Sequence, residues 1–247
     1  MQSSELVVPE DRAVRLWLGL GSASAVLFVL TALLVTSSTG VARFDNDLMA
    51  LMSARRQPFL TSVAQTVTDL GSYRPVAVAQ LVLAFLVGLR VRRLLEPVVL
   101  LVAVEASSSL VELFKPVIHQ ARPPTGEMLG APVFDYSFPS GHAASGTVLY
   151  LLGALLLTST EIPSSGRRLL VAASCVIGGL IGLSRVYLGY HWLTDVVGAW
   201  LLAVILTSIG MAFVTAPACR PHTLDSGPPG DAASLILGVG PAHRNLT

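Results

Sequence analysis

The stretch FPSGHAASG, residues 138–146, lies where a polar loop gives way to a long apolar run. Its Pro, Ser, Gly and His, placed where a helix should begin, permit two interpretations. In the first, the stretch is a turn followed by an ordinary N-cap, for which Ser140 is suited. In the second, the helix end binds an anion, because free backbone N–H groups and the partial positive charge of a helix N-terminus attract negative groups. The stretch alone favours the first interpretation, so the choice depends on the rest of the chain.

The overall composition is that of a protein dissolved mostly in lipid. The 247 residues are 53% hydrophobic and 13% charged, and the mean hydropathy is +0.69. A soluble domain carries roughly 25% charged residues. The net charge of +1 and the lack of a basic patch interleaved with aromatic residues give no indication of nucleic-acid binding.

Six apolar stretches are candidates to cross a bilayer, which takes about 20 residues in a helix. Their approximate bounds are 16–36, 75–89, 94–114, 140–158, 169–188 and 192–214. The second is short, and the third carries three glutamates, so these two are the weaker candidates. We expect an all-α, polytopic membrane protein with six transmembrane helices, the first of them an uncleaved anchor.

The remaining segments differ in character from the six apolar stretches. Residues 44–68 mix charged and apolar side chains and predict one or two amphipathic helices between the first two spans, on the membrane surface or across the bundle. From residue 216 the chain is rich in Pro and Gly, which indicates a flexible tail. The predicted organisation is therefore an N-terminus over 1–14, a membrane domain over 15–215 and a tail over 216–247.

Arginine placement predicts how the chain is oriented in the membrane. Cytoplasmic loops carry an excess of Lys and Arg. With a cytoplasmic N-terminus, the inner loops would hold Arg90, Arg92 and Arg93, and then Arg167 and Arg168. We expect a multi-pass protein of the plasma membrane with both termini in the cytoplasm and the polar ends of the third to sixth spans on the extracytoplasmic face.

Three cations are predicted to gather on that face. Lys115 ends the third apolar stretch, where Pro116 is expected to stop the helix. Arg122 lies in the following loop and Arg185 near the end of the fifth stretch. Arginine offers a planar fork of donors that suits phosphate oxygens. Each cation alone could simply extend to the interface, but three together with few nearby acids indicate an anion between them.

Two histidines and a carboxylate are predicted beside these cations. His191 and Asp195 are four residues apart, so on a helix they share a face and can form a hydrogen bond. A carboxylate on one imidazole nitrogen fixes the tautomer and increases the basicity of the other nitrogen, as a nucleophilic histidine requires. The alternative is a helix-capping pair. His142 lies in the first turn of the fourth span, where a structural role is the alternative to proton transfer.

Together these residues resemble a known family, the type 2 phosphatidic acid phosphatases (PAP2), the membrane branch of the lipid phosphatase and vanadium haloperoxidase superfamily. The family has three blocks: Lys-x6-Arg-Pro, Pro-Ser-Gly-His and Ser-Arg-x5-His-x3-Asp. Here they are KPVIHQARP (115–123), PSGH (139–142) and SRVYLGYHWLTD (184–195). Every block position matches in order, and the resemblance covers roughly residues 44–215.

The resemblance implies a catalytic role for three residues. His191 would attack phosphorus and form a phosphohistidine, and Asp195 would orient it. His142 would protonate the leaving oxygen and then help to activate the water that frees phosphate.

The resemblance also implies a phosphate-binding set and a chemistry without cofactors. The residues expected to bind the phosphoryl oxygens are Lys115, Arg122 and Arg185, with backbone N–H groups at Ser140 and Gly141. Family members need no metal, and the sequence has no cluster of acids near the site that could hold magnesium. We therefore expect neither a metal nor a cofactor.

The expected substrate is a lipid with a phosphate or diphosphate head that reaches the site laterally from the outer leaflet. Five aromatic residues are predicted at headgroup depth: Tyr136, Phe138, Tyr187, Tyr190 and Trp192. Recycling of a polyprenyl diphosphate carrier in cell-wall synthesis is the first choice of function. The other candidate substrates are phosphatidic acid, phosphatidylglycerol phosphate and a polyprenyl-linked sugar phosphate.

The blocks leave some alternatives open. A lipid phosphotransferase would use the same phosphohistidine, and the blocks do not separate it from a phosphatase. A haloperoxidase is disfavoured because those relatives are soluble. A lipid-binding or flipping protein without activity is disfavoured because binding alone has no need of the His191–Asp195 pair. The oligomeric state is not indicated by the sequence.

Overall fold

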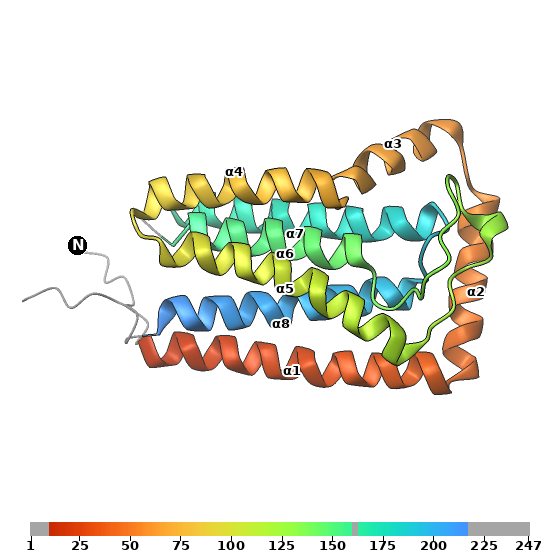
Figure 1. The fold of residues 1–247 in the computed structure, drawn as a ribbon, viewed down its shortest axis with the longest axis horizontal. Helices are drawn as coiled ribbons and strands as arrows, with labels where there is room; N and C mark the ends of the chain where they lie inside the picture. Colours follow the sequence, from red (N-terminus) through yellow and green to blue (C-terminus); the bar gives the residue numbers. More distant parts are fainter. Residues whose placement is uncertain (1–9, 160–162, 217–247) are drawn as a thin grey trace, which may run out of the picture.

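The computed structural model describes residues 10–159 and 163–216, and its secondary structure there is entirely helical. Figure 1 shows long helices lying side by side, with α2 across one end of the bundle. The elements are α1 (Glu10–Ser37), α2 (Thr39–Ala54), α3 (Pro58–Asp69), α4 (Tyr73–Val91), α5 (Leu95–Ile118), the 3₁₀ helix η1 (Thr125–Glu127), α6 (Gly141–Leu157), α7 (Ser164–Tyr187) and α8 (Leu193–Thr215). The predicted all-α class is confirmed.

Five of the described helices are long and apolar enough to cross a membrane, namely α1, α4, α5, α7 and α8. The predicted fourth span is helix α6, which is apolar but has only 17 residues. Helix α6 is apolar because it lies inside the bundle and packs against α4, α5, α7 and α8. Its residues Val148, Leu149 and Leu152 are fully buried inside the protein. The count of six spans therefore stays a prediction.

Two helices fill the segment predicted to be amphipathic. The chain turns after α1 at Ser38, whose hydroxyl accepts a hydrogen bond from the N–H of Val41 (3.3 Å). A second break follows α2, and Pro58 begins α3 at a position where a helix needs no N–H donor. Helix α3 packs against α7. The relation of α2 and α3 to the membrane surface stays a prediction.

Helix α5 continues past Pro116, contrary to the expectation that the helix would stop at Lys115. A proline removes only the hydrogen bond of its own missing N–H, and the helix ends two residues later at Ile118, so this short continuation is tolerated. The next residue, His119, adopts a left-handed conformation (φ 56°) and donates its N–H to the carbonyl of Lys115 (3.0 Å). Lys115 therefore lies on the last turn of a regular helix.

The described ends of the chain lie at the same end of the bundle. In Figure 1 the beginning of α1 and the end of α8 are both on the left, opposite α2. Helix α1 begins at Glu10, before the predicted span. The predicted flexible tail over 216–247 lies outside the described residues except for Ala216.

Arg56, in the link between α2 and α3, fixes the turn that leads from α7 to α8. Its guanidinium donates to the carbonyls of Tyr187 (3.2 Å) and Glu127 (2.7 Å) and forms an ion pair with the Glu127 carboxylate (3.3 Å). Gly189 lies at this junction with φ +79°, and a Cβ there would overlap the carbonyl of Glu127. Only glycine fits this backbone conformation and this close approach without strain.

We predict that Gly189→Ala destabilises the protein, because alanine must adopt a strained φ and displace the Glu127 carbonyl. The expected cost is on the order of 1–3 kcal/mol or more, measured as a lower thermal midpoint in detergent. Gly126→Ala, in η1 next to Glu127, is the control because its Cβ would meet no atom within 4 Å. Equal stability of the two variants would contradict the prediction.

Candidate active site

The ends of four helices bring the predicted polar residues to one place. Lys115 lies in the last turn of α5 and Arg185 in that of α7. His142 and Asp195 lie in the first turns of α6 and α8. Arg122 belongs to the loop between α5 and α6, and His191 to the turn before α8.

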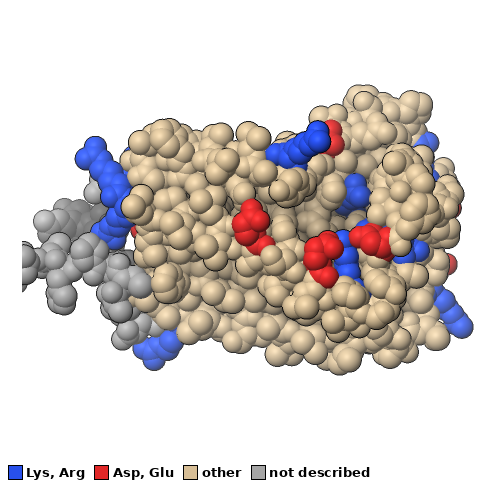
Figure 2. Space-filling view, in the orientation of Figure 1, with Lys and Arg blue, Asp and Glu red and all other residues tan. Residues whose placement is uncertain are grey.

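A cavity of about 470 Å³ joins most of these residues. The predicted site residues that line it are Lys115, Arg122, Gly141, His142, Arg185 and His191. Its other walls include Tyr73 and Val76 of α4 and Ser108 and Val111 of α5. Figure 2 shows a hollow in this face of the molecule, with basic side chains inside it and acidic side chains near its margin. The cavity therefore opens sideways between α4 and α5.

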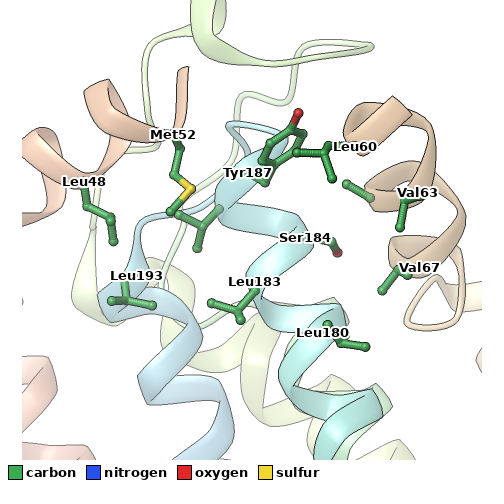
Figure 3. Close-up of a pocket in the computed structure, with 12 residues that line it drawn as sticks. Leu48, Met52, Leu60, Val63, Val67, Leu180, Leu183, Ser184, Tyr187 and Leu193 are labelled. Atoms are coloured by element: carbon green, nitrogen blue, oxygen red, sulfur yellow. The ribbon is translucent and has the colours of Figure 1, made fainter. Parts of the chain in front are cut away.

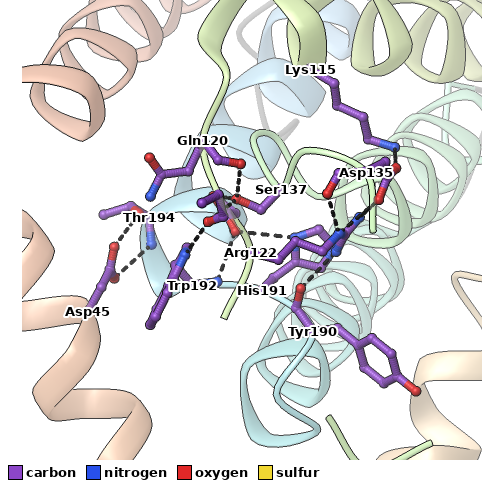
Figure 4. A network of polar contacts seen from close by, with 12 residues as sticks. Asp45, Lys115, Gln120, Arg122, Asp135, Ser137, Tyr190, His191, Trp192 and Thr194 are labelled. Carbon is purple, nitrogen blue, oxygen red and sulfur yellow. Dashed lines mark hydrogen bonds and ion pairs between the residues drawn. The ribbon is translucent and has the colours of Figure 1, made fainter. Parts of the chain in front are cut away.

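The contacts of His191 determine which tautomer it adopts. Its Nε2 lies 3.2 Å from Nη1 of Arg122 (Figure 4). Its Nδ1 lies 3.3 Å from Oδ2 of Asp195. A guanidinium can only donate, so Nε2 is the acceptor and Nδ1 carries the proton that is donated to Asp195. Burial, followed by the positive charges of Arg185 and Arg122, lowers the pKa of His191, which leaves the imidazole neutral near pH 7.

Asp195 is fully buried behind His191. Its carboxylate accepts a hydrogen bond from the backbone N–H of Trp192 (2.9 Å) and lies 3.2 Å from the hydroxyl of Ser137. The Ser137 hydroxyl is also 3.2 Å from the carbonyl of Ala121. These contacts tie the carboxylate to the loop between α5 and α6. Ser137 was not identified from the sequence, although it lies only two residues before the PSGH block.

A second missed residue, Ser72, touches His142. The Ser72 hydroxyl at the beginning of α4 lies 3.2 Å from Nε2 of His142. This contact is possible because the preceding Gly71 packs closely on α6. A Cβ at Gly71 would lie 2.7 Å from the carbonyl oxygen of His142. In the sequence, Gly71 and Ser72 indicated only the break before the second span.

Arg185 is 8% exposed and held on two sides. Its Nη1 donates to the hydroxyl of Thr68 (3.2 Å), and its guanidinium lies 4.2 Å from the centre of the Tyr190 ring. Among the described residues, its Nε has no hydrogen-bond partner. A buried donor without a partner is costly, so Arg185 is well placed to receive an oxygen from a ligand in the cavity.

Lys115 and Arg122 both contact the carboxylate of Asp135, and Lys115 Nζ also donates to Glu112 Oε1 (2.7 Å). Lys115 Nζ donates to Asp135 Oδ2 (2.7 Å), and Arg122 Nε donates to Asp135 Oδ1 (2.8 Å). Burial alone would raise the pKa of Asp135, but the hydrogen bonds from Lys115 and Arg122 outweigh it and hold that pKa below its usual range. Asp135 was not among the predicted site residues.

The structure corrects the role expected of Ser140. Its backbone N–H donates to the carbonyl of Asp195 (3.1 Å), and its hydroxyl makes no capping bond to the helix. Ser140 is fully buried and therefore joins α6 to α8 instead of facing a ligand. Of the two predicted backbone donors, only Gly141 lines the cavity.

Two of the five predicted interfacial aromatics are buried inside the protein. Phe138 is fully buried, 5.6 Å from Phe28 between ring centres, and it packs against the backbone of Gly198. Trp192 is 8% exposed, and its indole N–H donates to the carbonyl of Ala121 (2.7 Å). These two rings therefore do not face lipid as interfacial aromatics would, because they hold the loop between α5 and α6 against the bundle.

A separate hollow between α2, α3 and α7 has a different character. Its volume is about 390 Å³, and its lining includes Leu48, Met52, Val63, Val67 and Leu183 (Figure 3). The residues that line it carry no formal charge. It therefore offers no charged side chain to a phosphoryl group, unlike the cavity at His191.

Comparisons with known proteins agree with this arrangement. A family model described as the PAP2 superfamily matches residues 96–218. Phosphatidylglycerophosphatase B of Bacillus subtilis is 27% identical over 187 residues, which cover 74% of this chain and 89% of that protein. Undecaprenyl-diphosphatase of Sulfolobus acidocaldarius is 37% identical over 99 residues, 37% of this chain and 42% of the relative.

A solved structure shows the same fold. The crystal structure of a transmembrane PAP2-type phosphatidylglycerolphosphate phosphatase from Bacillus subtilis matches with a TM-score of 0.73 at 24% sequence identity, over 78% of this chain and 95% of that one. The family match spans all three sequence blocks, and those blocks meet at one cavity. The chain therefore belongs to the PAP2 superfamily.

Proposed function

We propose that this protein is a membrane lipid phosphatase that hydrolyses a phosphomonoester or diphosphate head group through a phosphohistidine. The observation that carries the proposal is the state of His191. Its Nε2 is an acceptor in contact with Arg122, in a cavity that Lys115 and Arg185 also line, while Asp195 holds the opposite nitrogen. A neutral nucleophile and cations that stabilise transition-state charge are what phosphoryl transfer needs.

The first step forms the phosphoenzyme. A phosphoryl group in the cavity would take over the donors of Arg122, which frees Nε2 of His191 to attack phosphorus. The new N–P bond forms as the P–O bond to the lipid breaks, and the His191 imidazole becomes positively charged and is stabilised by Asp195. The protonated form of His142, favoured by the negative charge of the substrate, would give its proton to the leaving oxygen.

The second step returns the enzyme to its starting state. His142, now neutral, would accept a proton from a water molecule whose oxygen attacks phosphorus. The N–P bond breaks and inorganic phosphate leaves. No protein group changes its oxidation state in either step. We expect both steps to proceed without a metal.

Two lipid classes are the leading substrates. A polyprenyl diphosphate of cell-wall carrier recycling was the first choice from the sequence, and one relative is named undecaprenyl-diphosphatase. Phosphatidylglycerol phosphate is supported by the relative named phosphatidylglycerophosphatase B, because the match covers 89% of that protein. The opening between α4 and α5 would admit the head group of either lipid from the bilayer. A substrate panel with both lipids separates the two.

The proposed membrane arrangement has α6 as a sixth span, with both termini in the cytoplasm and the cavity on the extracytoplasmic face of the plasma membrane. The shared position of the two described chain ends in Figure 1 supports termini on one side. Tag accessibility at the C-terminus in intact cells tests the orientation.

We predict that the purified protein releases phosphate from a lipid phosphate with a chelator present, and that His191→Ala lowers the rate at least about 10³-fold. The reason is that alanine removes the nucleophile. His119→Ala is the matched control, because His119 is an exposed loop residue whose ring lies against Tyr136. Full activity of His191→Ala would refute the mechanism, and transfer of phosphate to a second lipid without release would favour a phosphotransferase.

We predict that Ser72→Ala slows the reaction by positioning His142 less well. The expected loss is about tenfold in kcat, a part of the 10²–10⁴-fold that proton transfer contributes, with little change in KM. Because a good leaving group needs no proton, the loss should be smaller with para-nitrophenyl phosphate than with a lipid phosphate. An equal loss with both substrates would show that Ser72 acts only on the structure.

A further inference from the structure

Asp135 occupies the donors that a phosphoryl group would use. Its carboxylate contacts Lys115 Nζ at 2.7 Å and two nitrogens of Arg122 at 2.7 and 2.8 Å. The backbone carbonyl of Asp135 accepts a further bond from Arg122 (3.0 Å). The same residue lines the cavity beside His191 (Figure 4). A ligand that binds both cations must therefore compete with this carboxylate, and at Lys115 also with that of Glu112, which lies 2.7 Å from Nζ.

The two sides of this ion pair differ in how firmly they are held. The side chain of Asp135 is 45% exposed, whereas those of Lys115 and Arg122 are only 12% and 8% exposed. Arg122 is also fixed by the carbonyl of Tyr190 (2.7 Å). The carboxylate is therefore the partner that can move into solvent, while the cations stay in place.

The position of the cavity creates a need for selection by charge. In the proposed membrane arrangement it opens between α4 and α5 toward the lipid, and a bilayer presents phosphodiester head groups at high local concentration. A phosphodiester carries one negative charge and has two free oxygens. A phosphomonoester carries about 1.5 to 2 negative charges at pH 7 and has three free oxygens. Without a competitor, the cations would bind both kinds of head group.

We propose that Asp135 is a specificity-determining residue that excludes phosphodiester lipids from the phosphoryl site. A phosphodiester that displaces the carboxylate replaces one negative charge by another and gains little. A phosphomonoester or diphosphate brings more charge and more acceptor oxygens to Lys115, Arg122 and Arg185, so it displaces the carboxylate. The inference rests on the proposed function, because it assumes that these cations bind the phosphoryl group.

The test compares the wild-type protein with Asp135→Asn in detergent micelles. One measurement is the dissociation constant of inorganic phosphate, obtained by calorimetry without turnover. The other is inhibition of lipid phosphate hydrolysis by phosphatidylglycerol, a monoanionic phosphodiester, added at increasing mole fraction. We expect Asp135→Asn to bind phosphate about tenfold more tightly and to be inhibited by phosphatidylglycerol at about a tenfold lower mole fraction.

Two further variants control for charge and for folding. Asp47→Asn removes the same charge from an exposed position on α2, which does not line the cavity, and should behave as wild type. Asp135→Glu keeps the competing carboxylate and should restore the wild-type discrimination. A single symmetric elution peak in size exclusion shows that each variant is folded.

The outcomes separate this inference from the function on which it rests. Weaker or unchanged phosphate binding by folded Asp135→Asn, or unchanged inhibition by phosphatidylglycerol, would overturn the role of Asp135 and show that it merely positions the cations. A wild-type protein that binds phosphate but releases none from any lipid phosphate would instead count against the proposed function.

Discussion

The carboxylate of Asp195 is the interaction on which the rest of the site depends. The carboxylate is fully buried and accepts hydrogen bonds from His191 and from the N–H of Trp192. The backbone carbonyl of Asp195 accepts a further one from the N–H of Ser140. A buried carboxylate is costly unless hydrogen bonds satisfy it. The same residue therefore fixes the tautomer of His191 and joins the first turn of α8 to the beginning of α6.

Helices outside the three sequence blocks support this centre. Asp45 on α2 accepts hydrogen bonds from the N–H and hydroxyl of Thr194, at the N-terminus of α8. Burial raises the pKa of Asp45, and the hydrogen bonds from Thr194 partly offset that increase. Arg56, between α2 and α3, holds the turn between α7 and α8 through a hydrogen bond to the carbonyl of Tyr187. The α2–α3 segment thus holds the turn that carries His191 in place, through Asp45 and Arg56. Its sequence predicted only amphipathic helices.

The sequence predicted the helical class and the cluster of site residues because both leave a local signature. Apolar runs indicate helices in lipid, and blocks such as Ser-Arg-x5-His-x3-Asp place chemistry at fixed helical spacing. Asp135 and Ser72 leave no such signature. Their contacts join segments 20 and 70 residues apart, and the charge balance at Lys115 becomes visible only when the loop between α5 and α6 is folded.

Other differences arose where a local rule competed with packing. Pro116 predicted a helix end, but the helix continues to Ile118 because the proline removes only one backbone hydrogen bond. Ser140 predicted free donors, but the chain before α6 lies against α8 and uses one of them. Phe138 predicted an interfacial ring, but the small residue Gly198 leaves room for it inside the bundle.

The central claim is that His191 carries the phosphoryl group between the two steps. Rapid acid-free quenching after mixing with radiolabelled lipid phosphate, followed by peptide mapping, tests it most directly. The account predicts a label that survives alkali, is lost in acid and lies on the peptide that contains His191. Label on another residue, or rapid phosphate release with no labelled enzyme under conditions that accumulate the intermediate, would contradict it.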